Sequence, residues 1–205
     1  MRKKRVAILI SGRGSNMTAL IEAAKADDYP AEIALVVSNR PDASGLGRAR
    51  DAGIAAVVID HAPFGEDREA FERALDGKLQ ACRIDIVCLA GFMRLLTPWF
   101  VTRWSGRMLN IHPALLPRFK GLHTHRRALK AGVPRHGATV HFVVPEMDAG
   151  PIVEQDSVEV RASDTEATLA ERVLEVEHRI YPRALRALAE GNAKLPPAGD
   201  KDGVN

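Results

Sequence analysis

The chain has 205 residues, of which 46% are hydrophobic and 27% charged, and its formal net charge is +3. A chain of this size and composition buries a sizeable core as one large domain or two tightly joined halves, without disulfide or metal staples. The small net charge and the low aromatic content of 5% argue against a nucleic-acid partner.

The start of the chain and its two cysteines indicate a cytoplasmic setting. The basic residues 1–5 precede an apolar run of only five residues, 6–10, which is too short for a signal peptide or a membrane span. Cys82 and Cys88 lie among apolar residues and lack the spacing of a redox or zinc motif. The sequence therefore predicts reduced thiols and no contact with a membrane.

The first half of the chain alternates apolar runs with helical patterns. Strands are expected over residues 6–10, 32–37, 55–59 and 85–89. Helices are expected over residues 17–25, 45–52 and 67–81. This alternation is typical of an α/β protein with a parallel twisted sheet and helices on both faces, as in a Rossmann-like half.

The pattern changes after residue 105. Strands are expected over residues 108–112, 137–144 and 151–160, and helices over 125–131 and 163–188. Ser163 and Glu166 have the spacing of a capping box for the last helix, and Pro182 should kink or break it. No linker separates the halves, so one continuous sheet and a single domain over 1–190 are expected, with halves of about 1–105 and 106–190. The tail 191–205 has almost nothing to bury and should be mobile.

A glycine loop, residues 11–16, joins the first strand to the first helix. Its two glycines permit a tight turn, and the free N–H groups at the helix start favour a phosphate. A dinucleotide fingerprint is incomplete, because Met17 replaces its last glycine and no acidic residue ends the second strand. A monophosphate therefore fits better than a dinucleotide, and a bare strand-to-helix turn is the alternative.

A polar cluster follows in the second half. Asn110 and His112 are two apart in an expected strand and therefore share a face. An amide and an imidazole placed together suit acyl transfer, since both can stabilise an oxyanion and the imidazole can move a proton. Asp148, in a loop before a strand, can orient the imidazole. Taken alone, each of these residues is more typical of a turn than of a catalytic site.

Other titratable side chains are open to two interpretations. The remaining histidines do not complete a metal-ligand pattern, so no metal is expected, and His123 and His141 are expected to be structural or to support the site. Glu177 flanks the apolar stripe of the last helix. Its carboxylate either binds a cationic amine or pairs with a neighbouring arginine.

Taken in order, these motifs resemble the folate-dependent phosphoribosylglycinamide (glycinamide ribonucleotide) formyltransferases of purine biosynthesis. The resemblance runs from Arg5 to about Leu188 and rests on residues 10–16, 89–96, 109–117, 121–125, 136–142, 148–151 and 177–182. It implies the formyltransferase fold, in which a mostly parallel sheet is continued by a mixed second half. It also implies transfer of a formyl group from 10-formyltetrahydrofolate to the amine of glycinamide ribonucleotide, without a metal, in a monomer or homodimer.

The resemblance also implies roles for individual residues. Asn110, His112 and Asp148 would be the catalytic set. Phosphate binding would fall to Gly14, Ser15 and Asn16, and Glu177 would hold the amine side of the ribonucleotide. The folate would be bound by Arg68, Met93, Arg94, Leu95, Leu96, Asn110 and Val144. The family has a small or polar residue at the position of Arg13, so contacts to the phosphate can differ here.

Three other interpretations of the sequence fit it less well. Formyltetrahydrofolate hydrolases share the catalytic set but carry an extra N-terminal regulatory domain. Methionyl-tRNA formyltransferases carry an added C-terminal RNA-binding domain. A nucleotide-binding oxidoreductase or a non-catalytic nucleotide-binding module would explain the glycine loop but not Asn110, His112 and Asp148.

Overall fold

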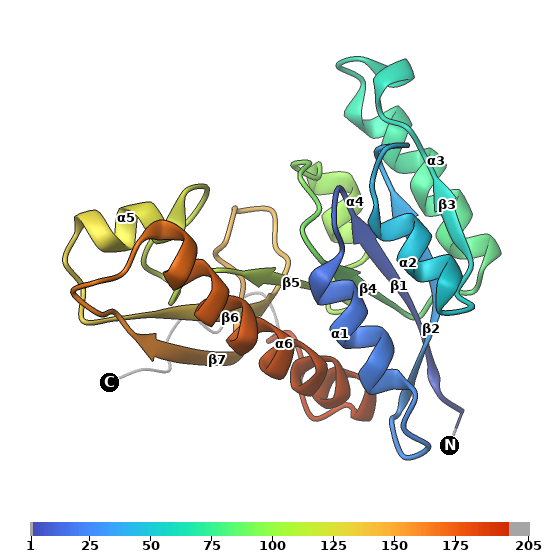
Figure 1. Ribbon diagram of the computed structural model, residues 1–205. Coiled ribbons are helices and arrows are strands. Elements are labelled where there is room, and N and C mark those ends of the chain that lie inside the picture. The colour runs from blue at the N-terminus through green and yellow to red at the C-terminus, as the bar shows by residue number, and fades with distance from the viewer. Residues whose placement is uncertain (1, 197–205) are drawn as a thin grey trace.

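The computed structural model describes residues 2–196, and its seven strands form one sheet (Figure 1). The strand order is β3-β2-β1-β4-β5-β6-β7. The parallel strands are β1 Lys4–Ile10, β2 Ala31–Ser38, β3 Ala56–Val58, β4 Ile86–Leu89 and β5 Met108–His112. Strand β6, Arg135–Phe142, pairs antiparallel with β5 and with β7, Ile152–Glu159. One continuous, mostly parallel sheet is thus confirmed.

Helices cover both faces of the sheet. The core on one face is formed with α1 Ser15–Ala24, α2 Gly45–Asp51 and α6 Glu166–Glu190. The core on the other face is formed with α3 Arg68–Ala81 and α4 Pro98–Arg103. Helix α5, Thr124–Lys130, packs beside α6, and a short 3₁₀ helix spans Ala62–Phe64. Within residues 2–196, no helix combines the length and the apolar character needed to cross a membrane.

The burial of β1 on both faces explains its continuous apolar sequence. Val6, Ile8 and Ile10 pack on the α1 and α6 side, whereas Ala7 and Leu9 pack on the α3 and α4 side. Each large side chain buried in this way contributes about 1.5–3 kcal/mol to folding. A strand with solvent on one face would instead alternate polar and apolar residues.

The expected elements agree with the structure to within three residues, but the sequence patterns do not predict α4 or the short 3₁₀ helix at Ala62–Phe64. Thr97 precedes α4 in extended conformation and Pro98 occupies its first turn. A threonine followed by proline is a typical helix start. The helix has only six residues, so it shows too little periodicity to stand out in the sequence.

One expectation for the last helix was wrong. The capping box is formed by Thr165 and Thr168, because the N-cap of α6 is Thr165, two residues after Ser163. The helix also runs through Pro182 without a break. A buried apolar stripe holds α6 against the sheet on both sides of the proline, so tertiary packing outweighs the lost helical hydrogen bond.

The tail is partly packed. Ala193 and Leu195 lie partly buried against the larger core, so the expectation that residues after 190 bury almost nothing is wrong for this stretch. The rest of the expected mobile tail, residues 197–205, lies outside the described residues.

Candidate active site

The carboxyl ends of β1, β4 and β5 meet at one edge of the sheet. From β1 the chain moves outward to β3 and then returns to β4 on the other side of β1 (Figure 1). Ligands of open α/β sheets bind in the crevice at such a reversal. The glycine loop after β1, the 91–97 loop after β4, and His112 at the end of β5 all reach this edge.

The glycine loop has the geometry of an anion site. Gly14 has a φ of 72° and directly precedes α1, and a Cβ there would lie 3.0 Å from the Met17 methyl group. No side chain caps α1, and its first turn has no acidic residue, so its first N–H groups are open to a ligand. Arg13 is exposed beside them. The loop therefore fits a phosphate.

The side chain of Asn16 contacts Glu177 on α6. The Asn16 amide nitrogen lies 2.5 Å from Glu177 Oε2, and both residues are buried. Burial raises the pKa of the Glu177 carboxyl group, and the hydrogen bond from Asn16 opposes that shift. Asn16 Oδ1 is buried and has no hydrogen-bond partner among the described residues. The pair offers a carboxylate and a free carbonyl oxygen to a ligand that donates hydrogen bonds.

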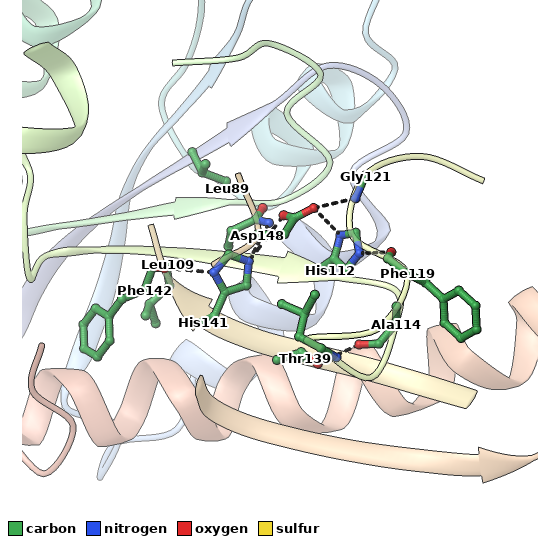
Figure 2. Close-up of polar contacts among 12 residues, drawn as sticks. Leu89, Leu109, His112, Ala114, Phe119, Gly121, Thr139, His141, Phe142 and Asp148 are labelled. Carbon is green, nitrogen blue, oxygen red and sulfur yellow. Dashed lines mark hydrogen bonds and ion pairs between the residues drawn. The ribbon is translucent and has the colours of Figure 1, made fainter. Parts of the chain in front are cut away.

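The carboxylate of Asp148 lies between the rings of His112 and His141 (Figure 2). Asp148 Oδ2 is 3.4 Å from His112 Nδ1 and accepts a hydrogen bond of 2.8 Å from the backbone N–H of Gly121. On the other side of the ring, His112 Nε2 lies 3.0 Å from the Phe119 carbonyl oxygen. Both ring nitrogens of His112 therefore face an oxygen that accepts hydrogen bonds.

His141 fixes the orientation of Asn110. The two residues are directly opposite each other on β5 and β6, and Asn110 Nδ2 lies 3.2 Å from His141 Nε2. His141 Nδ1 lies 2.8 Å from the Phe142 carbonyl oxygen and so carries the proton. Burial lowers the pKa of His141, which agrees with a neutral ring whose Nε2 accepts from Asn110. One N–H of the amide therefore remains available to a substrate.

The loop that carries Asp148 depends on Gly150. A Cβ at this position would lie 1.7 Å from the Phe142 carbonyl oxygen. We expect Gly150→Ala to lower the free energy of unfolding by about 3 kcal/mol or more, because backbone must move. Urea unfolding checks this, with Gly47→Ala as the control, since a Cβ at helical Gly47 meets no atom within 4 Å. Equal stability of the two variants would contradict it.

The 91–97 loop presents apolar side chains to solvent. Met93 is 71% exposed and Leu95 is 60% exposed. The Arg94 guanidinium carbon lies 5.5 Å from the centre of the Phe71 ring on α3. At the end of the loop, Glu72 of α3 accepts hydrogen bonds from both the N–H and the hydroxyl group of Thr97. The loop is thus attached to α3 while its apolar side chains remain open to a ring-shaped ligand.

Buried His136 lies behind the catalytic set. Burial, together with the nearby His125 and His112, lowers the pKa of His136 from 6.5 to about 4. The unfolded chain therefore binds a proton between about pH 6.5 and 4 that the folded chain does not, and stability falls as the pH drops through this window. When the pH is lowered from 7 to 5, the free energy of unfolding of His136→Gln should fall by roughly 2 kcal/mol less than that of the wild type.

Urea unfolding at the two pH values measures this difference. The lowered pKa values of His125, His141 and His178 also weaken the wild type in acid, but both proteins share them. An identical loss of stability in both proteins would contradict the assignment to His136.

The structure brings most of the candidate residues to one edge, in three groups. The glycine loop and Glu177 form one group, and Asn110, His112 and Asp148 form the second. The third group is the 91–97 loop. Val144 is half-buried in the loop that follows β6. Arg68 is exposed at the first residue of α3, and its side chain makes no hydrogen bond or ion pair within residues 2–196. Arg68 lies one helical turn before Glu72, and Glu72 accepts a hydrogen bond from Thr97 at the end of the 91–97 loop.

Sequence reasoning did not single out two polar residues of this edge, Ser11 and Glu72. In the sequence, Ser11 is marked only as part of the glycine loop, and Glu72 only as one residue of the helix expected over 67–81. An acidic side chain within an apolar helix stripe, beside Phe71, was the available signal for Glu72.

Comparison with known proteins gives consistent results. A family model described as formyl transferase matches residues 4–185. The chain is 46% identical over 190 residues to the phosphoribosylglycinamide formyltransferase of Escherichia coli, covering 93% of this chain and 89% of that relative. It is also 49% identical over 198 residues to the human trifunctional purine biosynthetic protein adenosine-3, covering 97% of this chain but only 20% of that relative.

Solved structures agree with the fold. The crystal structure of phosphoribosylglycinamide formyltransferase from Brucella melitensis superposes with a TM-score of 0.88 at 50% identity, covering 95% of this chain and all of that one. Glycinamide ribonucleotide transformylase 1 from Symbiobacterium toebii gives a TM-score of 0.91 at 46% identity, covering 95% and 92% of the two chains.

Proposed function

This chain belongs to the formyl transferase family, and we propose that it transfers the formyl group of 10-formyltetrahydrofolate to the amine of glycinamide ribonucleotide. The products are formylglycinamide ribonucleotide and tetrahydrofolate, and the step belongs to de novo purine biosynthesis. The observation that carries this proposal is the Asp148 carboxylate facing the His112 ring, beside an Asn110 amide oriented by His141.

The ribonucleotide binds across the two halves of the chain. Its phosphate is bound by the backbone N–H groups at the start of α1, at Gly14, Ser15 and Asn16, with the Ser15 hydroxyl close by. The exposed guanidinium of Arg13 adds a positive charge there. Glu177 accepts a hydrogen bond from the glycyl amine and is itself oriented by the Asn16 side chain. In this arrangement the side chain of Asn16 serves the amine end, while its backbone serves the phosphate.

The formyl donor binds against the 91–97 loop. Exposed Met93 and Leu95 offer apolar surface to the pterin ring, and Arg94 and Leu96 flank them. Val144 contributes from the loop after β6, and Arg68 supplies positive charge for the carboxylate end of the folate. Such a pocket is mostly apolar with a few polar groups that set orientation, as is usual for small-molecule sites.

The transfer proceeds by direct attack. The neutral glycyl nitrogen forms a bond to the formyl carbon, and the formyl oxygen becomes an oxyanion. Asn110 donates its free N–H to that oxygen, and the His112 imidazolium stabilises the same charge. The bond between the formyl carbon and N10 of the folate then breaks. The proton lost by the amine reaches N10 through Asp148 and solvent, so no covalent enzyme intermediate forms.

Asp148 has two roles in this scheme. Its carboxylate fixes the orientation of the His112 ring, and the Gly121 N–H holds the carboxylate in turn. The lowered pKa of His141 leaves that ring neutral, so the charge of Asp148 is directed to His112. We place the reaction in the cytoplasm, in a monomer or homodimer that needs no metal and no nucleic acid.

The test mixes purified protein with 10-formyltetrahydrofolate and follows deformylation by absorbance, with and without glycinamide ribonucleotide. Loss of the formyl group only with the ribonucleotide supports the proposal. Equal loss without it indicates a hydrolase. No loss in either case, beside an active control enzyme, rejects the proposal.

A further inference from the structure

We propose that Ser11 couples the glycine loop to the 91–97 loop, so that each substrate raises the affinity of the protein for the other. The inference rests on the proposed function, because it concerns the phosphate and folate ends of the same site. Ser11 acts here as a positioning residue that links two loops and does not touch either substrate.

The two loops diverge from neighbouring parallel strands, and Ser11 bridges them where the backbone pairing ends. The Ala90 N–H donates to the Leu9 carbonyl at 2.9 Å, and the Ser11 N–H donates to the Gly91 carbonyl at 3.2 Å. Gly91 has a φ of 74°, and the chain turns away from β1. Two residues after Gly91, the backbone N–H of Met93 donates to the Ser11 hydroxyl oxygen at 2.7 Å. A side chain thus replaces the backbone as the acceptor.

The hydroxyl of Ser11 both donates and accepts a hydrogen bond within the protein. Its oxygen accepts from Met93, and its proton is donated to Asn39 Oδ1 at 2.6 Å. Ser11 is only 8% exposed. Three segments that follow three adjacent strands, β2, β1 and β4, are therefore held by one hydroxyl group. A residue in this position transmits a change in the glycine loop directly to Met93.

The rest of the 91–97 loop depends on this link at its start. Its far end is fixed to α3, where Glu72 accepts from Thr97. Between the two ends, Met93 and Leu95 are mostly exposed. A phosphate at the start of α1 fixes the glycine loop, and through Ser11 it fixes Met93 before folate arrives. By thermodynamic reciprocity, bound folate must raise the affinity for the ribonucleotide by the same factor.

Calorimetric titration of tetrahydrofolate, under anaerobic conditions, measures this coupling. Tetrahydrofolate lacks the formyl group, so a complex with glycinamide ribonucleotide cannot react. In the wild type we expect the ribonucleotide to raise tetrahydrofolate affinity by about fivefold or more, and in Ser11→Ala by less than about twofold. The reverse titration should give the same factors. In Ser11→Cys, where a sulfur keeps the shape but bonds weakly, the coupling should be intermediate.

Ser38→Ala is the matched control. Ser38 is buried at the end of the neighbouring β2, and its hydroxyl bonds only to the backbone of Arg40. This variant should lose stability but keep the wild-type coupling. If Ser11 had a purely structural role, the two alanine variants would instead affect the coupling alike. Coupling that is absent from the wild type, or retained in both Ser11 variants, overturns the inference. A wild type that binds neither compound rejects the proposed function itself, and the inference with it.

Discussion

His112→Ala should lower kcat by about 10²- to 10³-fold, the loss typical of removing one oxyanion donor. The His112 ring lies 3.4 Å from Asp148 and is 6% exposed, so little solvent is present to replace it as a hydrogen-bond donor. Asn110→Ala should lower kcat by a similar factor, because His141 holds the Asn110 amide in the orientation that donates to the oxyanion. Ground-state binding of both substrates should change little, since the oxyanion exists only during transfer.

Single-turnover formyl transfer measures this loss, and calorimetric binding of tetrahydrofolate separates it from a folding defect. Asn192→Ala is the control for the asparagine variant, because the exposed side chain of Asn192 forms a hydrogen bond only with Glu190. The double variant of Asn110 and His112 should lose less than the product of the single losses, because both donors serve one oxygen. Near-normal turnover in both single variants would show that the oxyanion forms elsewhere.

Glu177→Gln should raise KM for glycinamide ribonucleotide by about 10- to 100-fold, as expected when a charge-assisted hydrogen bond is lost. Burial raises the pKa of Glu177, so part of the wild-type population is protonated in mild acid. The carboxylate is the form that accepts from the amine. Wild-type kcat/KM for the ribonucleotide should therefore rise as the pH increases through this pKa. The glutamine variant should lack this part of the rise and keep only the part that comes from deprotonation of the amine itself.

Initial-rate measurements between pH 5 and pH 8, at saturating formyl donor, test this expectation. Glu175→Gln is the matched control, because Glu175 lies on the same helix but is exposed. Affinity for tetrahydrofolate alone should be unchanged in both variants. An unchanged KM in Glu177→Gln would show that the amine binds in another part of the crevice.

The sequence predicts the parallel half well, because its strands are buried on both faces. Runs such as residues 6–10 stay apolar without interruption, and the helices between them show clear periodicity. The β5 face was also predictable, since a period of two places Asn110 and His112 together. What the pattern could not supply is the pairing register. Asn110 meets His141 only because β6 runs antiparallel to β5 in one particular alignment.

Contacts between distant segments were beyond prediction from local patterns. Nothing near Asn16 indicates that its side chain points to Glu177 rather than to a phosphate. The six residues of α4 are too few for a periodic signal, although Thr97 and Pro98 mark its start. The Ser11 link depends on where β1 and β4 diverge, which only the sheet order determines.

The contact between Asn16 and Glu177 joins residues 161 positions apart, across α1 and the final helix. During synthesis the glycine loop leaves the ribosome early, and the β5–β6 pairing can follow from nearby segments. The amine end of the site is complete only after α6 has emerged and packed against α1, a non-local step that comes late. A nascent or truncated chain without α6 therefore contains the residues of the phosphate loop but lacks the carboxylate that would accept from the amine.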